Sequence, residues 1–142
     1  MKKLLFTGGT GFLGKNVMPI LEKQYEVTTC GITLGNIIKT NLAKEVPKLI
    51  QHYDIVLHAA GKAHSIPKNI TEEQVFFDIN LQGTLNLCAA LEKSGVPNSF
   101  IFISSVSVYG LDQGELITED HSLFAKDPYG VSKIQAESLV QK

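Results

Sequence analysis

The chain has 142 residues, 44% of them hydrophobic, which is enough for one domain with its own core. With 13 basic and 14 acidic residues its net charge is -1, so it lacks the basic excess that nucleic acids or acidic lipids attract. Cys30 and Cys88 lie far apart and belong to no C-x-x-C pair, which argues against a disulfide framework or a metal site and favours a reducing, cytoplasmic location. No segment reaches the ~20 consecutive apolar residues of a membrane span.

Strand-like and helix-like patterns alternate along the chain. Short apolar runs predict buried strands at residues 3–7, 25–30, 37–42, 54–58 and 100–108. Apolar residues at helical spacing predict helices at 15–24, 43–52, 71–94 and from Tyr129 to the chain end, the second one shortened or kinked by Pro47. Such alternation indicates a parallel sheet with right-handed crossovers and helices on both faces. There are no repeats or linkers, so we expect one domain over residues 1–142.

Two of the expected helices begin at residues of the capping type. Thr71, with Glu73 and Gln74 behind it, is the expected N-cap of the long helix. Asp127 followed by Pro128 supplies an N-cap and a first-turn proline for the last helix.

A glycine-rich segment, TGGTGFLG at residues 7–14, joins the first strand directly to the first helix. Glycines permit a tight turn and a close backbone approach to a bound group, and the free N–H groups at a helix start attract an anion. Between a strand and a helix, this pattern predicts a dinucleotide phosphate site at Gly8, Gly11, Phe12, Leu13 and Gly14. The alternative is a plain strand-to-helix turn.

The adenosine end of such a site is less well specified. A dinucleotide fold usually places an acid about 20 residues beyond the loop, where it bonds the ribose of NAD. Here the second strand ends as TTCGIT at residues 28–33, with neither an acid nor an arginine. Lys39 could meet a 2′-phosphate, although a solvated surface lysine is the simpler interpretation. The sequence leaves NAD and NADP as alternatives.

A tyrosine and a lysine four positions apart, Tyr129 and Lys133, share one face of the last helix. A nearby ammonium favours the phenolate, which makes such a tyrosine, with an ordinary pKa near ~10, a candidate general acid or base. Ser104, Ser105 and Ser107 stand at the carboxyl end of the preceding strand, the side on which open parallel sheets bind ligands. For Ser104 and Ser107, capping of a strand end is an equally good interpretation.

Taken together, these segments resemble the extended short-chain dehydrogenase/reductase family, in particular its nucleotide-sugar epimerase/dehydratase branch. The matching segments are TGGTGFLG at 7–14, HAAG at 58–61, Asn80 within FFDINLQGTLNL, FISSVSVYG at 102–110 and PYGVSK at 128–133. They follow the family's order over nearly the whole chain. The resemblance implies a Rossmann-like, doubly wound parallel sheet with NAD or NADP as cofactor. The implied cofactor-binding residues are those of the glycine loop together with Ala59, Ala60, Gly61, Asn80, Tyr129 and Lys133.

The same resemblance implies a catalytic triad of Ser105, Tyr129 and Lys133. Tyr129 would move a proton to or from a sugar hydroxyl, while Lys133 would hold the nicotinamide ribose and lower the pKa of the tyrosine. Ser105 would bond the reacting oxygen, and Asn80 would support the lysine and the active-site backbone.

The family's sugar 4,6-dehydratases carry S-T-D-E-V-Y-G at the strand end, where the Asp and Glu eliminate water. Val106 and Ser107 occupy these two positions here, which disfavours a dehydratase. A 4-epimerase acting by transient hydride transfer is the expected function. The alternatives are a 4-keto-sugar reductase of the same family, a non-catalytic NAD(P)-binding module, or a truncated domain that binds nothing well.

Members of the family are much longer than this chain, and their last strands and substrate domain follow the Y-x-x-x-K helix. We therefore expect residues 1–142 to be an incomplete NAD(P)-binding domain, truncated before those strands and without a substrate-binding domain. A nucleotide-sugar would be the substrate of the full-length parent. A second copy of the chain is the further expected partner, in a homodimer formed through helices 71–94 and 129–142. We expect no binding to nucleic acid or to a membrane.

Overall fold

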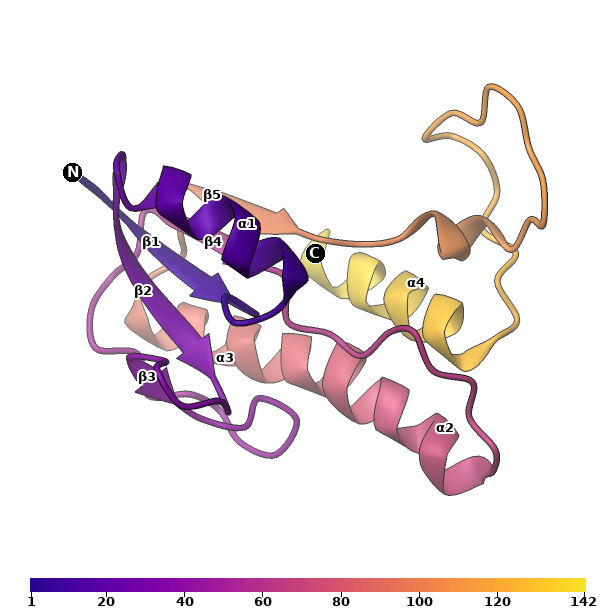
Figure 1. Ribbon diagram of the computed structural model, residues 1–142, viewed down its shortest axis with the longest axis horizontal. Coiled ribbons are helices and arrows are strands. Elements are labelled where there is room, and N and C mark those ends of the chain that lie inside the picture. The colour runs from indigo at the N-terminus through magenta and orange to yellow at the C-terminus, as the bar shows by residue number, and fades with distance from the viewer.

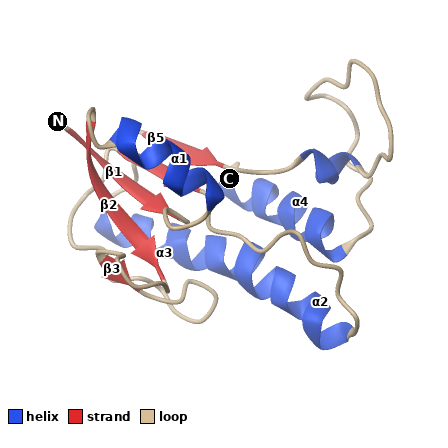
Figure 2. Cartoon of the chain, in the orientation of Figure 1, coloured by secondary structure: helices blue, strands red, loops and turns tan.

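An apolar strand, β1 (Lys2–Thr7), forms the centre of the protein because both of its faces are covered. The computed structural model describes residues 1–142, in which β1 is the middle strand of a sheet of five parallel strands (Figures 1 and 2). The other strands are β2 (Tyr25–Gly31), β3 (Ile38–Lys39), β4 (Ile55–His58) and β5 (Ser99–Phe102). Their spatial order is β3-β2-β1-β4-β5, so the chain winds outward from β1 and then returns to its other side. This confirms the doubly wound sheet, whose switch point lies between β1 and β4.

Helices cover the two faces of the sheet (Figure 1). They are α1 (Phe12–Leu21), α2 (Ile70–Phe77), α3 (Gly83–Ser94) and α4 (Pro128–Val140). A π-helical turn, Asp78–Gln82, joins α2 to α3, so together they form the long helix predicted at 71–94. Alternate residues of β1 serve the two faces: Leu5 belongs to the cluster that contains α3 residues, whereas Phe6 lies toward Met18 of α1. None of the helices combines the length and apolar character needed to cross a membrane.

The main core lies between the sheet and α3. Leu5, Cys30 and Val56 from three strands pack with Leu87 and Leu91 of α3, all essentially inaccessible to solvent. Each buried aliphatic side chain of this size stabilises the fold by roughly 1.5–3 kcal/mol. Burial also raises the pKa of the Cys30 thiol to about 11, so this thiol stays protonated, and both cysteines are free.

The helix boundaries follow capping chemistry. Asn69, rather than the predicted Thr71, is the N-cap of α2, and its side chain accepts the Glu72 N–H at 2.9 Å. The predicted start of α4 is confirmed, since the Asp127 carboxylate accepts the Gly130 N–H at 2.9 Å and Pro128 follows the cap.

Three predicted elements are wrong in extent or in kind. The last strand ends at Phe102 instead of residue 108, because Ser105 caps a 3₁₀ turn, Val106–Tyr109, by accepting the Ser107 N–H at 3.1 Å. Residues 43–52 form turns and irregular structure, not a helix, and β3 is shorter than the predicted 37–42. An Asn41 side chain that accepts the Ala43 N–H, and the missing N–H of Pro47, favour turns there.

Candidate active site

The glycine loop between β1 and α1 passes so close to the end of β4 that side chains cannot be accommodated. A Cβ on Gly8, whose φ is +80°, would stand 2.7 Å from the backbone of Ala59 and Ala60. A Cβ on Gly14 would stand 2.1 Å from the Gly9 carbonyl oxygen. The N-cap of α1 is Gly11, which offers no side-chain cap, so the first N–H groups of this helix remain free for an anion.

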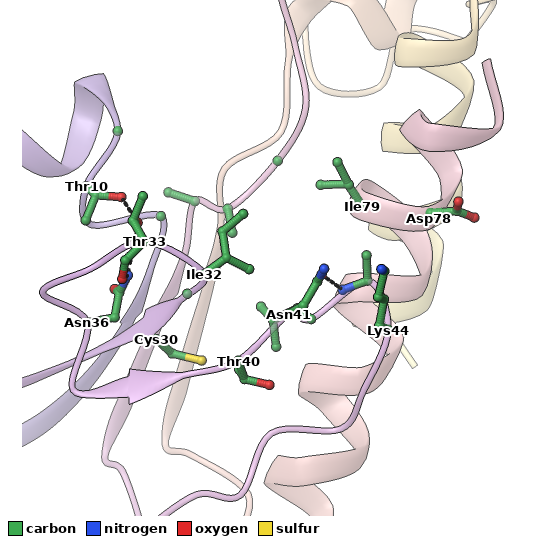
Figure 3. Close-up of a pocket in the computed structure, with 18 of the residues that line it drawn as sticks. Thr10, Cys30, Ile32, Thr33, Asn36, Thr40, Asn41, Lys44, Asp78 and Ile79 are labelled. Atoms are coloured by element: carbon green, nitrogen blue, oxygen red, sulfur yellow. Dashed lines mark hydrogen bonds between the residues drawn. The ribbon is translucent and has the colours of Figure 1, made fainter. Parts of the chain in front are cut away.

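A cavity of about 530 Å³ opens beside this loop, at the switch point of the sheet (Figure 3). It is lined by the glycine loop, the end of β2 and the loop after it, residues 40–44, the turn after β4, and Val75 of α2 with the π turn. Of the predicted cofactor-binding residues, Gly8, Gly11, Ala59, Ala60 and Gly61 line it. Its volume lies within the usual range for small-molecule and cofactor sites.

The remaining predicted loop residues do not line this cavity. Phe12 is 88% exposed, and Leu13 and Gly14 form the start of α1 with it. These three residues can therefore bind a phosphate through their backbone N–H groups and not through their side chains.

Lys133 is buried on α4 and reaches across to the ends of the strands. Its Nζ donates to the Ile103 carbonyl oxygen at 2.8 Å and lies 4.7 Å from the centroid of the Phe102 ring. A Cβ on Gly61 would stand 3.3 Å from this Nζ, so the ammonium sits against the turn that lines the cavity. Burial lowers the pKa of Lys133, and the Glu137 carboxylate one turn along α4 opposes this by raising it.

Tyr129 lies in the first turn of α4, and its ring centroid is 6.2 Å from that of Phe76 on α2. A glycine next to it, Gly130, lets α4 approach the 3₁₀ turn, since a Cβ there would stand 2.9 Å from the Ser107 carbonyl oxygen. Ser105 caps that same turn. Its Oγ accepts an N–H, which leaves the hydroxyl proton available for donation.

Ser104, by contrast, turns toward α4, where its hydroxyl donates to the Glu137 carboxylate. This contact and the hydrogen bond from Lys133 to Ile103 connect two successive residues after β5 to α4. The segment that carries Ser105 is thus held by the same helix as Tyr129.

Asn80 lies in the π turn, a distortion that often accompanies functional sites. Its Oδ1 accepts the Lys62 N–H at 2.7 Å, and its Nδ2 donates to the Lys62 carbonyl oxygen and to the Ser132 Oγ. The Ser132 hydroxyl in turn donates to the Tyr129 carbonyl oxygen at 2.7 Å. Asn80 therefore connects the segment after β4 to the first turn of α4.

A buried histidine, which the sequence marked only as part of HAAG, extends this network. Thr84 Oγ1 donates to the Asn80 carbonyl oxygen at 2.6 Å, so it must accept from His58 Nε2 at 2.9 Å. His58 Nδ1 is then an acceptor for the Thr7 hydroxyl at 2.5 Å, and Thr7 Oγ1 accepts the Ala60 N–H at 3.1 Å. Burial, with a smaller effect of the nearby Lys133 charge, lowers the pKa of His58 to about 3, so the ring is neutral.

The parallel sheet and the glycine loop at its switch point define a class, the Rossmann-like dinucleotide-binding domains. Residues 4–142 match the NAD dependent epimerase/dehydratase family. The chain belongs to this family, and its cofactor is accordingly NAD or NADP.

Two curated relatives illustrate the range of the family. The chain is 29% identical to a UDP-glucose 4-epimerase of Bacillus subtilis, over 97% of the chain and 47% of the relative. It is 32% identical to a GDP-6-deoxy-D-mannose reductase of Pseudomonas aeruginosa, over 97% of the chain and 46% of the relative. The chain spans about half the length of the curated relatives it matches.

Solved structures agree on the fold and on the type of ligand. A short-chain dehydrogenase/reductase superfamily protein of Agrobacterium tumefaciens with bound NAD is 28% identical, with a TM-score of 0.81 over 98% of this chain and 44% of that one. RMD from Pseudomonas aeruginosa, complexed with NADPH, is 30% identical, with a TM-score of 0.76 over 98% of this chain and 48% of that one.

The residues around the cavity fit a dinucleotide. Gly8 and Gly11 line the cavity beside the free backbone N–H groups at the start of α1, which are the donors that a diphosphate needs. On the same side of the cavity, the buried Asn36 Oδ1 has no hydrogen-bond partner, so this acceptor is available to a donor of the ligand.

Replacing Thr84 by Val should destabilise the protein, because the His58 N–H and the Asn80 carbonyl oxygen would both lose their partner inside the core. Loss of a buried hydrogen-bond partner costs about 1–3 kcal/mol. Thr84→Ser keeps the hydroxyl and serves as the matched control. Urea denaturation should rank Thr84→Val clearly below Thr84→Ser in free energy of unfolding; the reverse order would contradict the assigned hydrogen bonds.

The depressed pKa of His58 predicts a stability that falls as the pH is lowered. Its folded pKa, about 3, is below the ordinary value of 6.5, so between these values the unfolded chain binds a proton that the folded chain does not. The contribution is complete above pH 6.5 and declines below it, by up to about 1.4 kcal/mol per pH unit.

Urea denaturation between pH 6.5 and 5 measures this slope, before the carboxylates titrate. His58→Gln should flatten it, whereas replacing the half-buried loop residue His121 by Gln should not. In the unaltered chain, the NMR signals of the His58 ring should remain those of neutral imidazole at pH 5. A ring that protonates near pH 6.5 would show that His58 is not held as described.

Proposed function

We propose that this chain is the cofactor-binding and catalytic part of an NAD(P)-dependent nucleotide-sugar 4-epimerase. The observation that carries the proposal is the placement of Lys133. Its buried ammonium lies against the Gly61 turn of the cavity and one helical turn from Tyr129. The names of the epimerase relatives and the family itself support this choice.

In the proposed mechanism, the glycine loop and the start of α1 bind the dinucleotide phosphates, and the turn at Ala59 to Gly61 borders the rest of the cofactor. The bound dinucleotide supplies reversible hydride exchange with the sugar C4. Lys133 binds the nicotinamide ribose and, as a cation in a largely buried position, stabilises the phenolate of Tyr129. Tyr129 removes the proton of the 4-hydroxyl and later returns it.

Ser105 completes the proposed triad as a donor to the reacting sugar oxygen. Its Oγ is already used as an acceptor by the 3₁₀ turn, which orients the hydroxyl proton outward for this purpose. Asn80 acts through the backbone, since its amide holds Lys62 and Ser132 on either side of the site.

A dehydratase is disfavoured by the residues that follow Ser105. Val106 is 81% exposed and apolar, and Ser107 is engaged through its backbone in the 3₁₀ turn, so this segment offers no carboxylate pair for the elimination of water. A 4-keto-sugar reductase using the same triad is the second candidate, favoured by the similarity to the GDP-6-deoxy-D-mannose reductase. An epimerase restores its cofactor in each cycle, whereas a reductase consumes one reduced cofactor per product.

Association of two copies through the long helix and α4 is also proposed, in a reducing, cytoplasmic setting that suits two free cysteines. Leu85 on α3 is 43% exposed and available for such a contact. Val75 and Ile79, which share the long helix, line the cofactor cavity.

Replacing Tyr129 by Phe should reduce turnover by at least ~100-fold, because the phenol proton is lost while the ring is kept. Affinity for the dinucleotide should change little, since the glycine loop and Lys133 are untouched. Turnover should be measured by following the sugar products formed by the full-length parent protein. Tyr109→Phe, a second tyrosine-to-phenylalanine change nearby, is the control. Unchanged turnover in Tyr129→Phe would favour the non-catalytic NAD(P)-binding module.

A further inference from the structure

The end of β2 has an unusual construction. Gly31 stands where a side chain would project toward the cavity, and that space is filled by a side chain from the following loop. A Cβ on Gly31 would stand 3.1 Å from Asn36 Nδ2 and 3.4 Å from both its Cγ and its Oδ1. The amide of Asn36 thus takes the place of a strand-end side chain.

Hydrogen bonds hold this amide in a defined orientation. Asn36 Nδ2 donates to the Thr33 carbonyl oxygen at 2.9 Å and to the Thr33 Oγ1 at 3.1 Å. Thr33 Oγ1 is also bonded to Thr10 Oγ1 of the glycine loop at 2.8 Å. On the opposite side of the amide, the buried Oδ1 has no partner. A preoriented but unsatisfied acceptor indicates a group that a ligand completes.

The surroundings of Asn36 are polar and uncharged. Thr10, Thr33 and Asn36 line one side of the cavity, whereas its charged lining residues, Lys44 and Asp78, lie on the opposite side (Figure 3). At the end of β2, a carboxylate would select a ribose with free hydroxyls, and an arginine would select a 2′-phosphate. A neutral amide with hydroxyl neighbours carries no charge that would select either the free ribose or the 2′-phosphate.

We propose that Asn36 replaces the strand-end carboxylate as the group that binds the adenosine ribose, and that the chain therefore accepts both NAD and NADP. Its Oδ1 accepts a ribose hydroxyl, and the one hydroxyl proton of Thr10 and Thr33 that is not used in the bond between them can donate to a 2′-phosphate. This assignment rests on the proposed function, since it requires that the cavity binds a dinucleotide.

Calorimetric titration of the 142-residue chain with NAD and with NADP tests it. The two dissociation constants should differ by less than ~10-fold, because neither ligand gains or loses a charged partner at the ribose. In Asn36→Asp the new carboxylate should repel the 2′-phosphate and weaken NADP at least ~10-fold more than NAD. The matched control is Asn98→Asp, the same change at an exposed residue before β5, at the opposite end of the strands, which should leave the ratio unchanged.

A second variant keeps the test independent of any single substitution. Asn36→Ala should weaken both ligands, and adding Gly31→Asp to it should restore NAD alone, because the space vacated by the amide then holds a carboxylate. Circular dichroism of each variant verifies folding. The role of Asn36 would be overturned if Asn36→Asp left the ratio of the NAD and NADP dissociation constants unchanged. It would also be overturned if the unaltered chain preferred one of the two dinucleotides by more than ~10-fold; either result would leave the proposed function intact. No binding of either dinucleotide by the unaltered chain would contradict the proposed function as well.

Discussion

A buried line of hydrogen bonds connects the end of β1 to the helix that carries Tyr129, and the geometry of the whole site depends on it. It passes from the Thr7 hydroxyl through the neutral His58 ring to Thr84 and the Asn80 backbone. From Asn80 the side-chain amide continues to Ser132. Because every member is satisfied and buried, a shift of one element would leave polar groups unpaired in the core, and this penalty fixes the relative positions of β1, β4, the π turn and α4.

That constraint has a functional consequence at each end. At the β1 end, it accompanies the close approach of Gly8 to the turn after β4, which forms one wall of the cofactor cavity. At the α4 end, it accompanies the insertion of Lys133 between that turn and the end of β5. Phosphate binding and proton transfer, as proposed, are therefore parts of one rigid arrangement, which suits a reaction that requires a precisely placed sugar carbon.

Much of the fold was accessible from the sequence because it depends on local patterns. Alternating strands and helices, the strand–glycine–helix context of residues 7–14 and the cap at Asp127 each predict their element without knowledge of the rest. The helix expected at 43–52 was wrong, because turn-forming contacts of Asn41 compete with a weak helical pattern. The strand expected at 100–108 ends early, because Ser105 caps a 3₁₀ turn at Val106–Tyr109 by accepting the Ser107 N–H.

Other features could not be predicted because they depend on elements that meet only in the folded chain. The π turn at Asp78–Gln82 has the same apolar spacing as the helices on either side. His58 gains its role from Thr7 and Thr84, and Asn36 gains its place from the missing side chain of Gly31. For His58 and Asn36 the signal is a polar residue at the end of a buried strand or in the loop that follows, and the partner of each becomes known only from the structure.

The central claim, that the site at the switch point performs hydride-transfer chemistry with a bound dinucleotide, is tested most directly by a crystal structure of the protein with NAD or NADP. We predict that the phosphates lie on the glycine loop and that Lys133 Nζ donates to the nicotinamide ribose while keeping its bond to the Ile103 carbonyl oxygen. The Tyr129 hydroxyl should lie beside the same ribose. A dinucleotide bound elsewhere, or one whose nicotinamide lies out of reach of Tyr129 and Lys133, would contradict the claim.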